Sequence, residues 1–173
     1  YRNNLHKGMQ MKITRRNFIG GMAVTSLIDL LPQVSSAKNF ETKKNIIAGP
    51  GRSVLMDPGD KPTNLWLYNG SLPGPELRIK EGDQLNIHFQ NKLTVPTTIH
   101  WHGVKVPNAM DGVAGLTQPA VEPDETFSYK FKVSKPGTYW YHAHTMGWEQ
   151  VARGLYGALI VDGIKDFKVD HDI

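Results

Sequence analysis

The sequence predicts an all-β domain, either a sandwich or a Greek-key barrel, with seven or so short strands. Two observations support this fold class. Short segments alternate apolar and polar residues with the period of two expected of strands. The 17 glycines and 11 prolines of the 173-residue chain supply turn signals between these segments. We find no long helical periodicity and expect only one short turn, at residues 148–153.

The first three expected strands lie before the middle of the chain. An apolar and aromatic run at 65–68 precedes a loop rich in glycine and proline, and a short strand at 77–79 follows that loop. Residues 84–90 show the clearest alternation, because an apolar residue occupies every second position from Leu85 to Phe89. This pattern is typical of a half-buried strand.

Four more strands are expected in the second half. Residues 97–102 and 138–144 combine β-branched and aromatic residues with histidines, a composition that favours strands. Residues 127–133 alternate again, and a Lys-Pro-Gly turn separates them from the segment that begins at 138. Residues 155–161 form the last apolar strand.

Two stretches are expected to lie outside the strands. Residues 38–61 have only weak apolar character and are interpreted as a lead-in, whereas residues 107–123 are a long connection rich in glycine and proline. The length of the chain favours one domain with short appendages. We predict that this domain spans residues 38–163.

The formal charge of +4 belongs to the N-terminal segment. Residues 1–37 contain five basic residues and one acidic residue, so the rest of the chain holds 15 of each sign. A balanced domain has no basic stripe with which to contact phosphates, so we expect no nucleic-acid binding. The absence of cysteine is compatible with an oxidising compartment.

Residues 1–37 have the features of a twin-arginine export signal. The pair Arg15-Arg16 precedes a modestly apolar run, and small residues before the predicted cleavage site end at Ala37. The apolar run is too short for a membrane span, and Asp29 interrupts it. We therefore expect an exported or periplasmic protein without a membrane span. A basic N-terminal tail with no targeting role is the alternative.

Two histidine motifs carry the chemistry of the chain. His100 and His102 lie in H-W-H-G, and His142 and His144 lie in H-A-H. Because strand residues two apart point to the same face, each pair projects together, and four imidazoles can line one wall of a cavity. Imidazole binds Zn, Cu, Fe and Ni, so the motifs predict a metal site. Four hydrogen-bonded structural histidines are the alternative.

Other singled-out residues have simpler interpretations. Asp111 follows His100 by eleven residues in a Met-Asp-Gly turn, where it is either a carboxylate near the histidines or the cap of an Asx turn. His88 is out of phase with its apolar neighbours and is expected to be solvated. Trp101 and Tyr141 point away from the histidines and are expected in the core.

These motifs resemble the first cupredoxin domain of multicopper oxidases, from about Leu65 to Asp162. The phrases that carry the resemblance occur in order: Asn69-Gly70, Pro73-Gly74-Pro75, Glu81-Gly82-Asp83, H-W-H-G, Asp111-Gly112, the segment 137–144 and the segment 154–161. The chain is most similar to bacterial laccase-type and copper-resistance oxidases exported by the twin-arginine route. The resemblance implies a cupredoxin-like fold and copper as the cofactor.

The family holds a three-copper cluster between its first and last domains. The resemblance implies that His100 binds the type 2 copper and that His102, His142 and His144 bind the type 3 pair. Asp111 matches a family carboxylate that hydrogen-bonds solvent near the type 2 copper and helps deliver protons. The partners implied are dioxygen and a reducing substrate, either a phenol or a metal ion such as Cu(I).

The chain departs from the family at the site that receives electrons. That type 1 site is built on a cysteine thiolate in the last domain, and this sequence has no cysteine. We therefore interpret the chain as the N-terminal fragment of an oxidase, with residues 164–173 starting a linker to further cupredoxin domains. The full-length protein would reduce dioxygen to water, and the fragment alone is expected to be inactive. A non-catalytic periplasmic module that binds or sequesters copper is the alternative.

Overall fold

The computed structural model of the chain describes residues 41–164. Within them lie eight strands: β1 (Glu41–Ser53), β2 (Thr63–Tyr68), β3 (Gly74–Lys80), β4 (Gln84–Asn91), β5 (Ile99–His102), β6 (Thr126–Lys132), β7 (Gly137–Ala143) and β8 (Tyr156–Asp162). The helical elements are the short 3-10 turn η1 (Asn108–Met110) and α2 (Gly147–Gln150). The all-β prediction is confirmed. The predicted signal segment, residues 1–37, and all but the first residue of the predicted linker, residues 164–173, lie outside the described residues.

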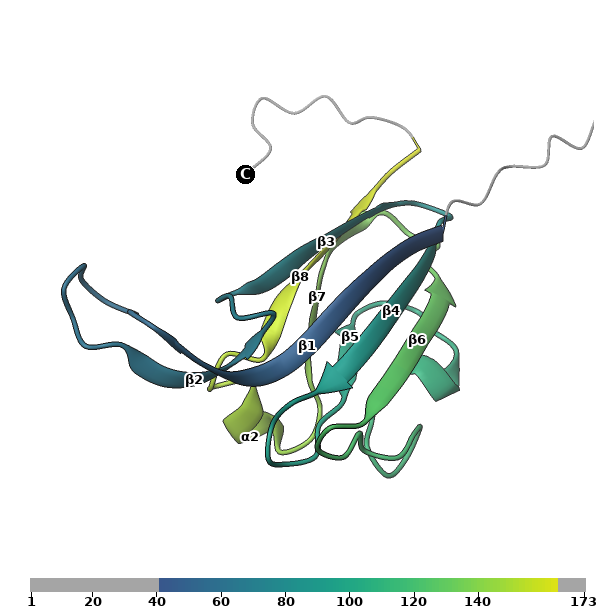
Figure 1. Ribbon diagram of the computed structural model, residues 1–173. Coiled ribbons are helices and arrows are strands. Elements are labelled where there is room, and N and C mark those ends of the chain that lie inside the picture. Colours follow the sequence, from purple (N-terminus) through teal and green to yellow (C-terminus); the bar gives the residue numbers. More distant parts are fainter. Residues whose placement is uncertain (1–40, 165–173) are drawn as a thin grey trace, which may run out of the picture. The chain divides into compact units, whose positions relative to one another are not determined.

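The strands form two four-stranded sheets that face each other (Figure 1). The first sheet has the order β2-β1-β4-β6, and the second has the order β3-β8-β7-β5. Neighbouring strands are antiparallel except for the pairs β1–β4 and β3–β8. The chain changes sheet at every connection from β2 to β7, and only the connections β1–β2 and β7–β8 stay within one sheet, as in a Greek-key sandwich.

Aromatic rings from both sheets fill the space between them. The ring centroid of Trp101 on β5 lies 5.4 Å from that of Tyr129 and 5.0 Å from that of Phe131, both on β6. Tyr68 on β2 meets Tyr141 on β7 at 5.4 Å. Because each contact joins opposite sheets, burial of these rings stabilises the sandwich. The expectation that Trp101 and Tyr141 lie in the core is confirmed.

The prediction that residues 38–61 are only a lead-in is wrong, because β1 occupies much of this range. Ile46 and Ala48 are fully buried, but polar neighbours and the Gly-Pro-Gly sequence around Pro50 obscure the strand pattern. Pairing with β4 ends at Ala48, whereas pairing with β2 continues to Ser53. Pro50 therefore has a neighbouring strand on one side only, a position where the missing N–H is tolerated.

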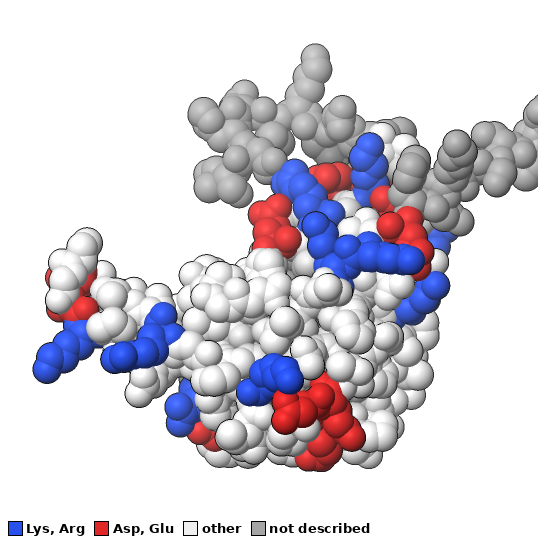
Figure 2. All heavy atoms as spheres, in the orientation of Figure 1, with Lys and Arg blue, Asp and Glu red and all other residues white. Residues whose placement is uncertain are grey.

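Basic and acidic side chains are mixed on the face shown in Figure 2. Lys130 Nζ lies 3.2 Å from Glu41 Oε1, and Lys92 Nζ lies 2.8 Å from Asp124 Oδ1. In both of these pairs, opposite charges lie next to each other. In the part of the chain that the structure describes, neither helical element has the length and apolar character that crossing a membrane requires.

Candidate metal centre

The motif histidines lie on the face of the second sheet that is turned away from the core. β5 is the edge strand of this sheet and β7 is its neighbour. In their ladder His100 lies directly opposite His142, and His102 lies opposite Trp140. Strand alternation sends Trp101 between the sheets and leaves the imidazoles on the outside.

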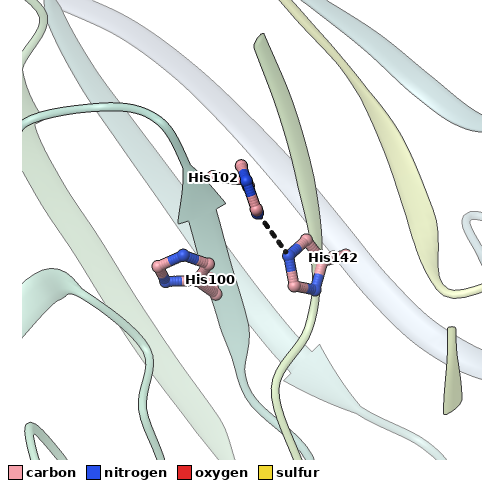
Figure 3. Close-up of side chains that lie close together, drawn as sticks. All are labelled: His100, His102 and His142. Atoms are coloured by element: carbon pink, nitrogen blue, oxygen red, sulfur yellow. Dashed lines mark hydrogen bonds between the residues drawn. The ribbon is translucent and has the colours of Figure 1, made fainter. Parts of the chain in front are cut away.

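Three of the imidazoles form a compact group (Figure 3). His100, His102 and His142 each offer a ring nitrogen, and these nitrogens all lie within 4.8 Å of one another. Nδ1 of His102 is 3.3 Å from Nε2 of His142. The fourth imidazole, His144, lies beyond the end of β7 with its ring centroid 5.0 Å from that of His100. The structure thus brings the four rings together, and their role as copper ligands stays a prediction.

Backbone carbonyls select which ring nitrogen two of these histidines present. Nδ1 of His100 lies 2.7 Å from the carbonyl oxygen of Asp111, and Nδ1 of His142 lies 2.9 Å from that of Ala143. A carbonyl can only accept, so each Nδ1–H donates, and in the neutral ring the lone pair then lies on Nε2. Metal-binding histidines commonly hold their second nitrogen in this way. The donor set therefore fits a metal that imidazole binds, copper included.

Partial burial is the main cause that lowers the pKa of His142 below its usual value. The hydrogen bond to Ala143 opposes this shift, and charge on His100, His102 and His144 adds to it. A lowered pKa favours the neutral imidazole, and only the neutral form has a lone pair for a metal ion. Burial, with a smaller contribution from the neighbouring rings, thus favours the protonation state in which His142 can bind a metal ion.

Asp111 contacts His100 with its carboxylate as well as its backbone. Its Oδ1 lies 3.5 Å from Nδ1 of His100. The loop can approach β5 this closely because residue 112 is a glycine with φ of +79°, where a Cβ would overlap the carbonyl oxygen of Ile99. The structure places Asp111 beside the histidines, and its role in proton transfer stays a prediction.

Trp140 is the site residue that sequence reasoning missed. Its ring stacks on that of His142 with centroids 4.1 Å apart, and it lies 5.0 Å from the ring of His102. The period of two residues in a strand could have identified it, because Trp140 precedes His142 by two residues and therefore lies on the same face of β7. His88 is exposed on β4 of the first sheet, which confirms the expectation that it is solvated.

The sequence of this chain matches known copper proteins. Residues 52–166 match the family described as multicopper oxidase. Copper resistance protein A of Escherichia coli is 38% identical over 162 residues, which cover 89% of this chain and 26% of that protein. L-ascorbate oxidase of Nicotiana tabacum is 51% identical over 98 residues, which cover 54% of this chain and 16% of that protein. The chain belongs to the multicopper oxidase family, whose name implies copper cofactors.

Solved structures of the family have the same fold. The multi-copper oxidase from Pseudomonas thermotolerans superposes with a TM-score of 0.72 at 42% identity, over 76% of this chain and 32% of that chain. The blue copper oxidase from Nitrosomonas europaea gives a TM-score of 0.68 at 36% identity, over 74% of this chain and 41% of that chain. The cupredoxin-like fold is therefore confirmed. The chain spans about a quarter of the length of the curated relatives that it matches along most of its own length.

Proposed function

We propose that this chain is the first cupredoxin domain of a multicopper oxidase and supplies half of its three-copper cluster. The observation that carries the proposal is the group of ring nitrogens of His100, His102 and His142, which lie within 4.8 Å of one another. In this proposal His100 is the type 2 ligand, and His102, His142 and His144 serve the type 3 pair. Bound copper would supply the one-electron steps that reduce dioxygen to water.

The chain's own residues hold the ligands and handle protons. The carbonyls of Asp111 and Ala143 orient two imidazoles, and the ring of Trp140 covers one side of His142. The carboxylate of Asp111 lies beside His100 with 32% of its side chain exposed, so it can exchange protons with solvent there. Because dioxygen reduction consumes protons, a carboxylate in this position suits their delivery.

Electrons enter outside these 173 residues in this proposal. A type 1 site needs a thiolate, and the sequence has no cysteine. The proposed reducing substrate is a phenol or a metal ion such as Cu(I), and further domains of the same protein would hold its binding site. Export to the periplasm by the twin-arginine route completes the proposal and rests on the pattern at Arg15-Arg16.

Copper titration of the full chain tests the site. We expect the chain to bind Cu(II), His100→Ala to weaken binding by about 10-fold or more, and the exposed control His88→Ala to bind normally. Equal binding by the His100→Ala variant contradicts the assigned site. Calorimetry and the copper content after dialysis measure the difference.

Activity assays separate the fragment from a complete enzyme and from a sequestering module. The copper-loaded chain should show no intense blue absorption and no turnover of a phenolic dye. Turnover that survives repurification and disappears in His100→Ala would show that the chain is a complete enzyme. A whole protein that binds copper at these histidines without consuming dioxygen would instead be a sequestering module.

A further inference from the structure

Two buried polar side chains connect the segments that flank the histidine motifs. Thr97 lies three residues before His100, Gln150 lies six residues after His144, and both Thr97 and Gln150 are 0% exposed. The Thr97 hydroxyl donates to Oε1 of Gln150 at 2.6 Å, and Nε2 of Gln150 donates to the carbonyl of Pro96 at 2.8 Å. The amide of Gln150 therefore makes two hydrogen bonds to one short segment.

This Thr97–Gln150 pair lies where the β5–β7 ladder has ended. The last residues paired in that ladder are Ile99 and Ala143, so His144 lies one residue beyond it. The ladder fixes the positions of His100 and His142 directly. His144 follows Ala143, whose backbone N donates to the carbonyl of Leu155 at 3.1 Å in the segment that returns after His144.

Backbone hydrogen bonds hold that returning segment together. The backbone N of Gln150 donates to the carbonyl of Met146 at 2.9 Å, and the backbone N of Leu155 donates to the carbonyl of Gln150 at 3.1 Å. The turn that contains α2 is thus a local unit, and the side chain of Gln150 ties this unit to residues 96–97.

We infer that the Thr97–Gln150 pair positions His144 against His100, which makes Gln150 a positioning residue of the copper site. The inference rests on the proposed function. A buried polar pair contributes little to stability beyond what two apolar side chains of the same shape would give. Its directional hydrogen bonds do fix one arrangement of the two segments, and the 5.0 Å separation of the His100 and His144 rings depends on that arrangement.

Single and double substitutions of Thr97 and Gln150 distinguish an effect on the stability of the fold from an effect on the position of His144. In the full chain we expect Thr97→Val and Gln150→Met each to lower the copper-free melting temperature, because each leaves a buried polar group without its partner. The double variant should regain part of this loss, since the hydroxyl and the amide are both gone and only the carbonyl of Pro96 has lost its donor. Its Cu(II) affinity should stay about 10-fold lower than that of the unmodified chain. The control Thr97→Ser keeps the hydroxyl and should bind copper normally.

Two further measurements test whether the lower Cu(II) affinity of the double variant arises at His144. On a His144→Ala background, adding the double substitution should weaken copper binding no further. In NMR spectra, the diamagnetic ion Zn(II), which imidazole also binds, should shift the ring nitrogen signals of all four histidines in the unmodified chain and leave those of His144 unshifted in the double variant. Thr97→Val at low temperature gives the same NMR readout if the double variant does not fold.

The outcomes distinguish this inference from the proposed function. Copper binding by the unmodified chain, with equal affinity and an equal Zn(II)-induced shift of His144 in the double variant, overturns the positioning role alone. An unmodified chain that binds no copper overturns the proposed function and this inference with it. Loss of affinity in the double variant that vanishes on the His144→Ala background supports the inference.

Discussion

The two faces of the β5–β7 ladder differ in what surrounds their side chains. The inner face is fully buried against the first sheet, with 0% exposure at each of Ile99, Trp101, Tyr141 and Ala143. The outer face carries the imidazoles and the ring of Trp140, which is 38% exposed. The same two strands thus supply the core on one side and the candidate ligands on the other.

This difference shows how the domain fixes its ligands without placing them in the core. Trp101 lies between His100 and His102 in the sequence, and Ala143 lies between His142 and His144. Each histidine pair therefore straddles a fully buried residue. Because a strand that shifts would move its inner and outer side chains together, core packing also holds the imidazoles in register.

Truncation on the inner face should have the largest effect on stability. Trp101→Ala removes a ring that contacts Tyr129 and Phe131, so we expect a loss of about 3–5 kcal/mol in the free energy of unfolding. Urea denaturation of the copper-free chain measures it. The control Trp148→Ala alters a side chain that is 79% exposed and should change stability by about 0.5 kcal/mol or less. Equal losses in the two variants would remove the contrast between buried and exposed rings.

Gly112→Ala should lower both the stability of the fold and the affinity for copper, and its effect on stability should be the second largest. An added Cβ would overlap the carbonyl of Ile99, and relief of this overlap moves the Asp111 carbonyl away from His100. We expect a loss of about 1–3 kcal/mol, together with weaker copper binding. Gly115→Ala is the matched control, because Gly115 has φ of +76° but no heavy atom within 4 Å of an added Cβ. Similar losses of stability in both variants would show that the positive φ of the glycine, and not the overlap with Ile99, causes the loss.

The sequence predicts most of the fold because strand patterning is a local property. Alternation at residues 84–90 and the two histidine motifs places the strands and assigns their faces. The pattern fails to predict β1, where Pro50 is tolerated only because the pairing of β1 with β4 ends before that residue. No local pattern reports which neighbours a strand will have.

The candidate site is predictable only in part for the same reason. The spacing of the histidines predicts shared faces, and the structure adds that the two pairs lie on adjacent strands of one sheet. The stacking of Trp140 follows from its place two residues before His142. The hydrogen bond from Thr97 to Gln150 joins residues 53 positions apart, and nothing local to either residue predicts it.

A change on the outer face should leave the fold nearly intact and remove copper binding. His142→Gln should lower the copper-free stability by about 1 kcal/mol, because the side chain lies outside the core but gives up its hydrogen bond to Ala143 and its stacking on Trp140. Copper at 100 times its dissociation constant should stabilise the unmodified chain by about 2.7 kcal/mol and this variant hardly at all. Thermal unfolding with and without copper measures both quantities, with His88→Gln as the control. A variant that copper still stabilises fully would remove His142 from the site.

Asp111→Asn should have the smallest effect on stability, because the bond to Nδ1 of His100 comes from the backbone carbonyl at 2.7 Å and survives the substitution. The carboxylate is partly exposed and lies 3.5 Å from the same nitrogen, so its loss should cost about 0.5 kcal/mol or less. In the complete enzyme, dioxygen reduction should slow by about 10²–10⁴-fold with unchanged copper content, because an amide cannot relay protons. Steady-state oxygen uptake and metal analysis decide between the two roles of Asp111. An unaltered rate leaves Asp111 as a turn residue, and on the outer face only the imidazoles would then carry the chemistry.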